Sequence, residues 1–161
     1  MKYQHTQVGK IMIAAVIMSM IIALIAILNQ DFSKYAPDWL DTSSWNMWGI
    51  VILIVAELFA INMTVLTIRI NEGELTWQFG IGIPKGALNI NDIVSVELVR
   101  NKWWYGFGIR RTSSGARLYN VEGLDAIEII NNEGAKIRFG TNDPKKLLRV
   151  LSSLTDNNEV V

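Results

Sequence analysis

The one ionisable side chain inside the most apolar part of the sequence is Glu57. It lies in residues 48–66, WGIVILIVAELFAINMTVL, which carry no other charge. A carboxylate in apolar surroundings is costly and is therefore a candidate functional group. A second apolar segment covers residues 11–28. If both segments cross a membrane, Ser19 lies at the same depth in the membrane as Glu57, so we expect Ser19 and Glu57 to form an intramembrane polar pair. The carboxylate would then either hold two helices together or take part in transport or signalling.

The residue types that carry out most enzymatic chemistry are scarce in this chain. There is no Cys, and His5 is the only His, which excludes a thiolate site, a His-based triad and a multi-His metal site within one chain. Asp125 and Glu128 are three residues apart in a predicted strand and therefore face opposite sides. The formal net charge is zero, which gives no global field for nucleic acid. We predict no enzymatic activity, no catalytic residue, no metal, no cofactor and no nucleic-acid partner.

Two apolar segments predict transmembrane helices over residues 11–28 and 48–66. The first is a run of 18 uncharged residues, which at about 1.5 Å per residue roughly spans a hydrocarbon core of about 30 Å. A signal peptide is the alternative for this run. It is disfavoured because its apolar region usually has about 7–15 residues and because no small-x-small cleavage pattern follows.

The cations that flank the two segments predict their orientation. Lys2 and Lys10 precede the first segment, and Arg69 follows the second, whereas residues 29–47 are poor in Lys and Arg. Because cytoplasmic flanks are enriched in these cations, we expect a cytoplasmic tail over residues 1–10 and an extracytoplasmic loop over 29–47. The prediction is a multi-pass protein of the inner (plasma) membrane with both termini in the cytoplasm.

Small residues recur at a spacing of four in both segments. Such residues let two helix backbones approach closely, which favours association in lipid. We therefore expect an antiparallel helix pair packed through Ala15, Ser19 and Ala23 in the first segment and Ala56, Ala60 and Thr64 in the second. The alternative is that this spacing arises by chance, because small residues are common in membrane helices.

After residue 66 the hydrophobic pattern changes from a helical period to a period of two. Leu75, Trp77 and Phe79 alternate with polar residues, and similar short segments follow, separated by turn residues. We count seven such strands, which predict an antiparallel sandwich or barrel. Pro144, preceded by Asp143, then predicts the start of an amphipathic helix. The predicted domain covers residues 67–155, and a short tail follows over 156–161.

Seven strands followed by one helix is the element order of pleckstrin-homology-like (PH-like) domains. Residues 105–111 (YGFGIRR), 119–123 (YNVEG) and 140–144 (GTNDP) resemble segments of bacterial PH-like membrane proteins. The resemblance implies a mainly-β split barrel of seven antiparallel strands, capped by the C-terminal helix and joined to a membrane α-helical hairpin. It implies no catalytic activity. PH domains that bind phosphoinositides carry cations at the first hairpin turn, but residues 71–74 (NEGE) are acidic, so phosphoinositide binding is not expected.

An aromatic cluster flanked by cations is the strongest candidate for a contact surface. Rings beside cations suit an anionic membrane surface or a partner. The alternative is that some of these rings pack in the core, where most large aromatic side chains lie. The candidate contact residues are Arg100, Lys102, Trp103, Trp104, Tyr105, Arg110 and Arg111.

Two functions are compatible with these patterns. The first is a non-enzymatic, membrane-anchored PH-like module that holds a protein-binding or assembly domain at the cytoplasmic membrane surface. Its expected partners are the lipid bilayer and either another protein or a second copy of the chain. The second is a membrane sensor or transport-accessory protein that uses Glu57 and the outer loop.

Overall fold

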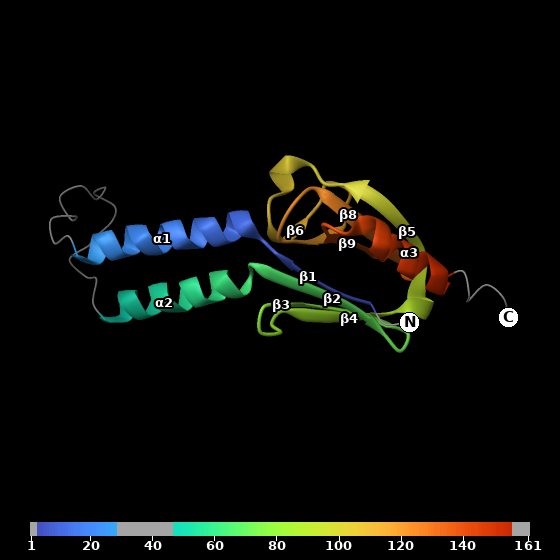
Figure 1. The fold of residues 1–161 in the computed structure, drawn as a ribbon, viewed down its shortest axis with the longest axis horizontal. Helices are drawn as coiled ribbons and strands as arrows, with labels where there is room; N and C mark the ends of the chain where they lie inside the picture. Colours follow the sequence, from blue (N-terminus) through green and yellow to red (C-terminus); the bar gives the residue numbers. More distant parts are fainter. Residues whose placement is uncertain (1–2, 29–46, 156–161) are drawn as a thin grey trace.

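The computed structural model of the chain describes residues 3–28 and 47–155. Two helices extend from one end of a β-rich part, and a third helix packs on that part (Figure 1). Of the loop predicted over 29–47, all but the last residue lies outside the described residues. The predicted tail over 156–161 lies outside them entirely.

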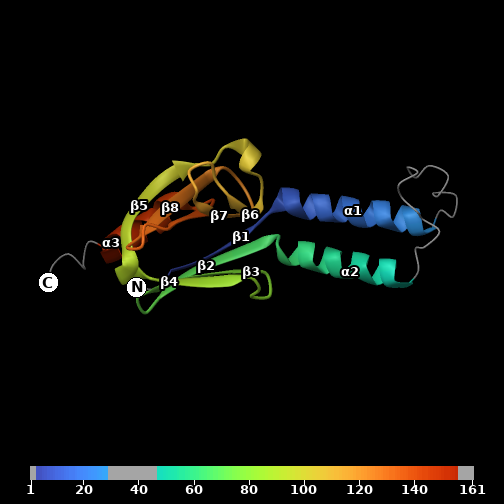
Figure 2. The same cartoon turned by 180° about the vertical axis from the view of Figure 1, so that it is seen from behind.

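Helices α1 (Lys10–Leu28) and α2 (Met47–Asn62) form the extended pair. They lie side by side and run in opposite directions (Figures 1 and 2). Their sequences are almost entirely apolar, so neither helix has a polar side. Large side chains such as Leu58 and Phe59 are more than half exposed on the helix surface. A helix that is apolar all round is stable only when other apolar groups cover it.

In the described part of the chain, no helix is both long and apolar enough to cross a membrane. The transmembrane helices predicted over 11–28 and 48–66 are therefore wrong, as are the membrane hairpin and the multi-pass plasma-membrane location. In the second segment, α2 ends at Asn62 because the chain pairs as a strand from Val65 onward. Its 16 residues, at about 1.5 Å each, reach about 24 Å, short of a hydrocarbon core of about 30 Å.

The N-terminal residues form strand β1 (Tyr3–Val8), where the sequence predicts a polar tail. β1 pairs antiparallel with β2 (Val65–Asn71), from Tyr3 opposite Ile70 to Val8 opposite Val65. The segment YQHTQV has no alternation of apolar and polar residues, so nothing in its pattern indicates a strand. Because β1 leads into α1 and α2 leads into β2, this pairing connects the two helices to neighbouring strands of one sheet.

The joints between helices and strands are held by hydrogen bonds and close packing. The Gly9 N–H donates to the Thr64 carbonyl oxygen at 2.7 Å. A Cβ on Gly9 would lie only 2.3 Å from the carbonyl oxygen of Val121, so this position needs glycine. At the end of α2, the Asn62 side chain accepts a hydrogen bond from the Ile81 N–H at 2.8 Å. The helix pair is therefore joined to the β-rich part without a flexible linker.

The first sheet contains four antiparallel strands in the order β1-β2-β3-β4, with β3 at Glu74–Phe79 and β4 at Lys85–Asn89. The predicted β2–β3 hairpin is confirmed, and its alternating residues Leu75, Trp77 and Phe79 are buried. β4 occupies the edge of the sheet. Pro84 precedes it, where the missing N–H costs no ladder hydrogen bond.

The second sheet contains five strands in the order β5-β8-β9-β7-β6. The short 3-10 turn η3 (Ile90–Asp92) connects it to the first sheet. Strands β7 and β9 pair in parallel, and the other neighbours are antiparallel. The bounds are β5 Ile93–Arg100, β6 Gly108–Arg111, β7 Arg117–Asn120, β8 Asp125–Asn131 and β9 Lys136–Gly140.

This topology differs from the predicted PH-like split barrel of seven antiparallel strands. The described residues form nine strands in sheets of four and five, and one of the strand pairs is parallel. The seven strands predicted from the sequence do not include β1, which lacks alternation of apolar and polar residues. They also do not include β4, because the glycines and proline around it indicate a bent edge or loop. Strand order across a sheet depends on long-range pairing, which local patterns do not contain. The PH-like resemblance is therefore not supported by the fold.

The core lies between the two sheets and helix α3 (Pro144–Thr155), which begins where the sequence predicts. The Phe139 ring lies 5.6 Å from Tyr119 in a stacked arrangement and 5.0 Å from Trp77 in an edge-on arrangement. Leu147 and Leu151 of α3 are fully buried in the same cluster. Together these side chains join both sheets to α3.

Replacing Tyr3 by Phe should stabilise the protein by about 1 kcal/mol at neutral pH. The Tyr3 hydroxyl is buried and has no hydrogen-bond partner among the described residues, and an unpaired buried hydroxyl costs about 1–3 kcal/mol. Burial, with a smaller contribution from Asp143, raises the pKa of Tyr3 to about 12. An unfolded tyrosine has a pKa of about 10. Above pH 10 the unfolded chain therefore loses this proton first, and stability falls between pH 10 and 12.

Urea unfolding at pH 7, 9 and 11.5 measures both effects. The Phe variant should be the more stable protein at pH 7 and should lose less stability than the wild type between pH 9 and 11.5. Equal losses in the two proteins would show that Tyr3 does not titrate in this range.

Candidate functional site

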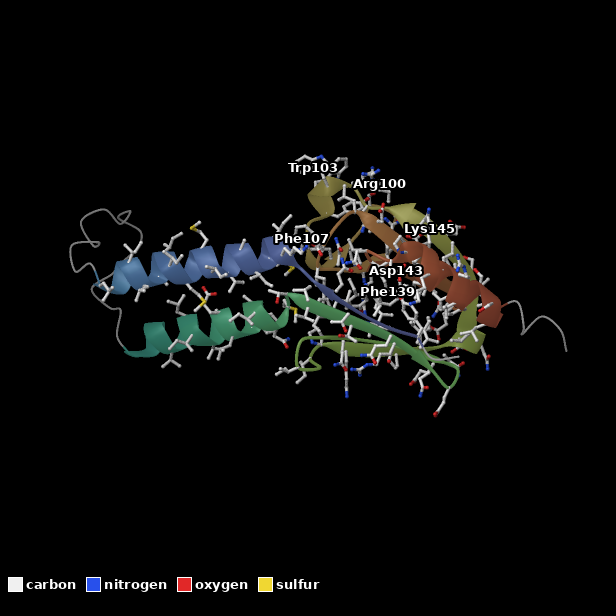
Figure 3. The ribbon with its side chains drawn as sticks, in the orientation of Figure 1. Arg100, Trp103, Phe107, Phe139, Asp143 and Lys145 are labelled. Carbon is white, nitrogen blue, oxygen red and sulfur yellow. The ribbon has the colours of Figure 1, made fainter. Side chains whose placement is uncertain are left out.

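Two tryptophan side chains project from the second sheet on the 3-10 turn η4 (Trp103–Tyr105). Trp103 is 77% exposed and Trp104 is 60% exposed. Figure 3 shows Trp103 at the outer tip of this turn, beyond the end of β5. The alternative that some rings of the cluster pack in the core therefore does not hold for these two. We call Lys102, Trp103 and Trp104 the Trp surface.

The rings and the cation of the Trp surface contact one another. The Trp103 and Trp104 rings are 5.9 Å apart and nearly perpendicular. The Lys102 Nζ lies 5.1 Å from the centre of the Trp104 ring, within the range of a cation–π interaction. Arg100 is exposed at the end of β5, close to the turn in sequence. The surface thus combines a large apolar area with positive charge.

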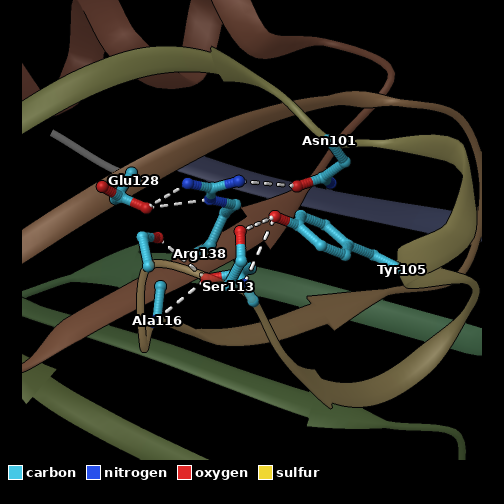
Figure 4. A network of polar contacts seen from close by, with 8 residues as sticks. Asn101, Tyr105, Ser113, Ala116, Glu128 and Arg138 are labelled. Carbon is cyan, nitrogen blue, oxygen red and sulfur yellow. Dashed lines mark hydrogen bonds and ion pairs between the residues drawn. The ribbon is translucent and has the colours of Figure 1, made fainter.

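The third aromatic residue, Tyr105, fixes the turn from its other end. Its hydroxyl lies 2.6 Å from the Ser113 Oγ and accepts a hydrogen bond from the Ser113 N–H at 3.3 Å (Figure 4). These two hydrogen bonds from Ser113, with smaller effects from the cations Lys102 and Arg138, lower the pKa of Tyr105 below its ordinary value. Tyr105 therefore attaches η4 to the turn between β6 and β7.

A buried ion pair supports the sheet beneath this turn. Arg138 of β9 is 8% exposed, and its Nε donates to the Glu128 Oε2 at 2.9 Å. Its Nη1 donates to the Asn101 Oδ1 at 3.2 Å (Figure 4). Asn101 is also buried and lies just before η4, and its N–H donates to the Leu124 carbonyl oxygen at 2.6 Å. Arg138 therefore positions the chain at the base of the Trp surface.

The candidate residues predicted from the sequence do not include Arg138, Asn101 or Ser113. Glu128 is considered there only with Asp125, as a possible acid/base pair, and is rejected. One signal for the ion pair is present in the sequence. A turn centred on Glu133 places residues 128 and 138 at equal distances from its centre, so they face each other in the β8–β9 hairpin. The contacts of Asn101 and Ser113 depend on the course of η4, which no local pattern indicates.

Two predicted contact residues lie apart from the Trp surface. Arg110 and Arg111 are neighbours in β6, so their side chains face opposite sides of the sheet. Arg110 borders a groove beside the helix pair, and Arg111 borders a separate cleft near the β6–β7 turn. The structure therefore does not gather all seven predicted residues into one site.

The predicted Ser19–Glu57 pair does not form. Ser19 is exposed, and its hydroxyl donates to the Val16 carbonyl oxygen at 2.8 Å within its own helix. Glu57 borders a groove between the helices together with Leu24 and Leu53, and its Oε2 is buried without a hydrogen-bond partner among the described residues. Equal depth places two residues at one level along the helices, but it does not fix their rotation about the helix axes.

The small residues predicted to pack the helices together are only partly at the interface. Ala60 is partly buried and Thr64 is buried, and Ala15 borders the same groove as Ala60. Ala23 borders the groove that contains Glu57. Ala56 is exposed. Two grooves therefore border the helix pair, one lined by α1 and α2 and the other lined also by residues of β6.

The chemical groups of the candidate site are aromatic rings, cations and one ion pair. In the described ranges no group of three or more His, Cys, Asp and Glu side chains could hold a metal ion. The charges of Arg138 and Glu128 are neutralised by each other. The Trp surface, in contrast, presents exposed rings and a cation held by buried contacts beneath them.

Comparison of the chain with protein-family models, with curated proteins and with solved structures found no match.

Proposed function

We propose that this chain is a non-enzymatic binding module that holds a protein partner through the Trp surface. The observation that carries the proposal is the exposure of Trp103 and Trp104 on a projecting turn. Tryptophan is enriched among the residues that dominate protein–protein binding energy, and exposed pairs of large rings are uncommon on surfaces without a partner.

The turn is organised for binding before any partner arrives. Tyr105 and Asn101 hold its two ends through Ser113 and Arg138. A surface that is already ordered loses less conformational entropy on association, which increases affinity. Lys102 and Arg100 add positive charge, so the expected partner presents an acidic rim around an apolar pocket.

The helix pair supplies the attachment of this module. Its large apolar side chains face outward on both helices, and such surfaces are stable against other apolar groups. Because Gly9 and Asn62 join the helices tightly to the sheets, attachment through α1 and α2 also sets the direction in which the Trp surface points.

Replacing both Trp103 and Trp104 by Ala should weaken partner binding by at least thirtyfold. The reason is that a central tryptophan contributes about 2 kcal/mol or more, and about 1.4 kcal/mol corresponds to a tenfold change in affinity. Photo-crosslinkers at positions 103 and 104 in cells of the source organism would first identify the partner, and titration with the purified partner would then measure affinity.

A matched control is available in Ile81→Ala, since Ile81 is 89% exposed on the turn between β3 and β4. This variant should bind the partner as the wild type does, and a crosslinker at position 81 should not capture it. Equal crosslinking from positions 81 and 103, or unchanged affinity of the double variant, would contradict the proposed function.

A sensing or transport-accessory function is the second candidate, and Glu57 is the observation that favours it. Its unpaired Oε2 lies in an apolar groove between the helices, where a change in its surroundings would have a large effect. Under the first function, Glu57→Gln leaves the affinity of the Trp surface unchanged. A change of tenfold or more in that affinity, measured by the same titration, would favour sensing.

A further inference from the structure

A groove of about 480 Å³ lies where the helix pair meets the second sheet. Its walls come from α1, α2 and β6 and include Met12, Phe59, Met63 and Ile109. Figure 3 shows Phe107, another wall residue, beside the first turn of α1. The volume falls within the range of about 300–1,000 Å³ that is typical of small-molecule sites.

Among the residues that the structure describes, Arg110 is the one charged side chain that borders this groove. Its Nε donates to the Phe107 carbonyl oxygen at 3.1 Å, which orients the guanidinium group and leaves its two terminal nitrogens available. No carboxylate among the described residues forms an ion pair with it. A guanidinium group in this position can bind both oxygens of a carboxylate or phosphate group.

We propose that this groove binds an amphiphile with an acyl chain and an anionic head group. The apolar walls accept the chain, because burial of its methylene groups removes them from water. Arg110 accepts the head, whereas a cationic head would meet like charge. The free guanidinium nitrogens and the apolar walls thus fit the two ends of one molecule.

The position of the groove favours a long chain over a compact ligand. Phe59 borders the groove and is also part of the exposed apolar surface of α2. A chain that leaves the groove therefore continues along apolar helix surface and not into water. This site uses neither Trp103 nor Trp104, so it goes beyond the protein-binding function proposed above and can be tested separately.

The test uses the full chain in a bulky, sterol-based non-ionic detergent that covers the helix pair. Dodecanoate with a photoactivatable group at its tail serves as the probe, and peptide mapping locates the label. Unlabelled dodecanoate, dodecyl phosphate and dodecyltrimethylammonium serve as competitors with the same chain and different heads. Label should appear on the segments around Met12, Phe59 and Ile109.

Arg110→Gln should reduce competition by both anionic amphiphiles at least fivefold. Arg117→Gln is the matched control, because Arg117 is an exposed arginine on the neighbouring strand β7 that does not border the groove. It should behave as the wild type does. Ala60→Phe, which fills the groove, should remove the label, and the arginine variants keep the test decisive if this variant does not fold.

The competitors also separate two sources of the same chemistry. Stronger competition by dodecyl phosphate indicates a phospholipid head, and stronger competition by dodecanoate indicates a free fatty acid. The proposal is overturned if dodecyltrimethylammonium competes as well as the anions do. It is also overturned if the label spreads evenly along α1 and α2, or if Arg110→Gln and Arg117→Gln behave alike.

Discussion

Replacing Phe139 by Ala should lower the free energy of unfolding by about 3–5 kcal/mol. Phe139 is fully buried, and its ring contacts Tyr119 of the second sheet and Trp77 of the first. Removing it loses the transfer free energy of the ring and leaves a cavity between rigid neighbours, which cannot collapse without moving both sheets. The loss is comparable to the whole stability of many small domains.

Urea unfolding in a mild non-ionic detergent, followed by tryptophan fluorescence, measures this loss. Val94→Ala provides the control, because Val94 is 68% exposed on β5 of the same sheet and should change stability by no more than about 0.5 kcal/mol. Similar losses in the two variants would show that the sheets do not pack through Phe139.

Replacing Glu128 by Ala should lower the free energy of unfolding by about 3 kcal/mol. The substitution leaves the Arg138 guanidinium buried without its carboxylate partner, and breaking a buried ion pair in this way costs about 3–5 kcal/mol. We take the lower end because the side chains of the pair retain 10–11% exposure, which lets water screen the remaining charge.

The double variant Glu128→Leu with Arg138→Met should be more stable than Glu128→Ala, because it leaves no buried charge unpaired. A double-mutant cycle compares this double variant with the single variants Glu128→Leu and Arg138→Met. Urea unfolding of the four proteins gives the coupling free energy between the two residues. Glu133→Ala, in the exposed turn between β8 and β9, is the control for loss of a carboxylate in the same hairpin. If the double variant loses as much as the two single losses combined, the residues act independently and the ion pair is not a unit.

The Glu128→Ala substitution also tests how the fold supports the proposed function. Arg138 holds Asn101 at the base of η4, so the loss of Glu128 loosens the support of the Trp surface. We expect Glu128→Ala to weaken partner binding modestly, through a surface that is less ordered before binding. The titration described for Trp103 and Trp104 detects this effect without further reagents.

Local patterns predicted the elements whose signal lies in a few neighbouring residues. The β2–β3 hairpin follows from the alternation of Leu75, Trp77 and Phe79, and α3 begins at Pro144 as its start signal indicates. The sequence also marks the aromatic and cationic residues from Arg100 to Tyr105 as a candidate contact surface, which stays a prediction. Their exposure was undecided, because burial depends on what the rest of the chain places over them.

The predictions from the sequence are wrong where the structure of a segment depends on residues far away in the chain. The residues of β1 have no strand pattern, yet they pair with β2 because α1 and α2 bring the two segments together. The apolar segments over 11–28 and 48–66 suggested membrane helices, but strand pairing from Val65 onward shortens the second helix. Hydropathy alone does not reveal such competition between helix and strand.

By itself, the sequence of this protein determined its division into an apolar helix pair and a β-rich part, and the position of α3. It also shows that the chain has no cysteine and no histidine other than His5. These properties depend on composition and on contacts between near neighbours. Only the tertiary structure decided that Trp103 and Trp104 project outward, that Arg138 is buried against Glu128 and Asn101, and that Arg110 borders a groove with the helices. Each of these three arrangements depends on which strands pair and on how the helices are rotated about their axes. Strand pairing and helix rotation are determined by packing between residues that are far apart in the sequence.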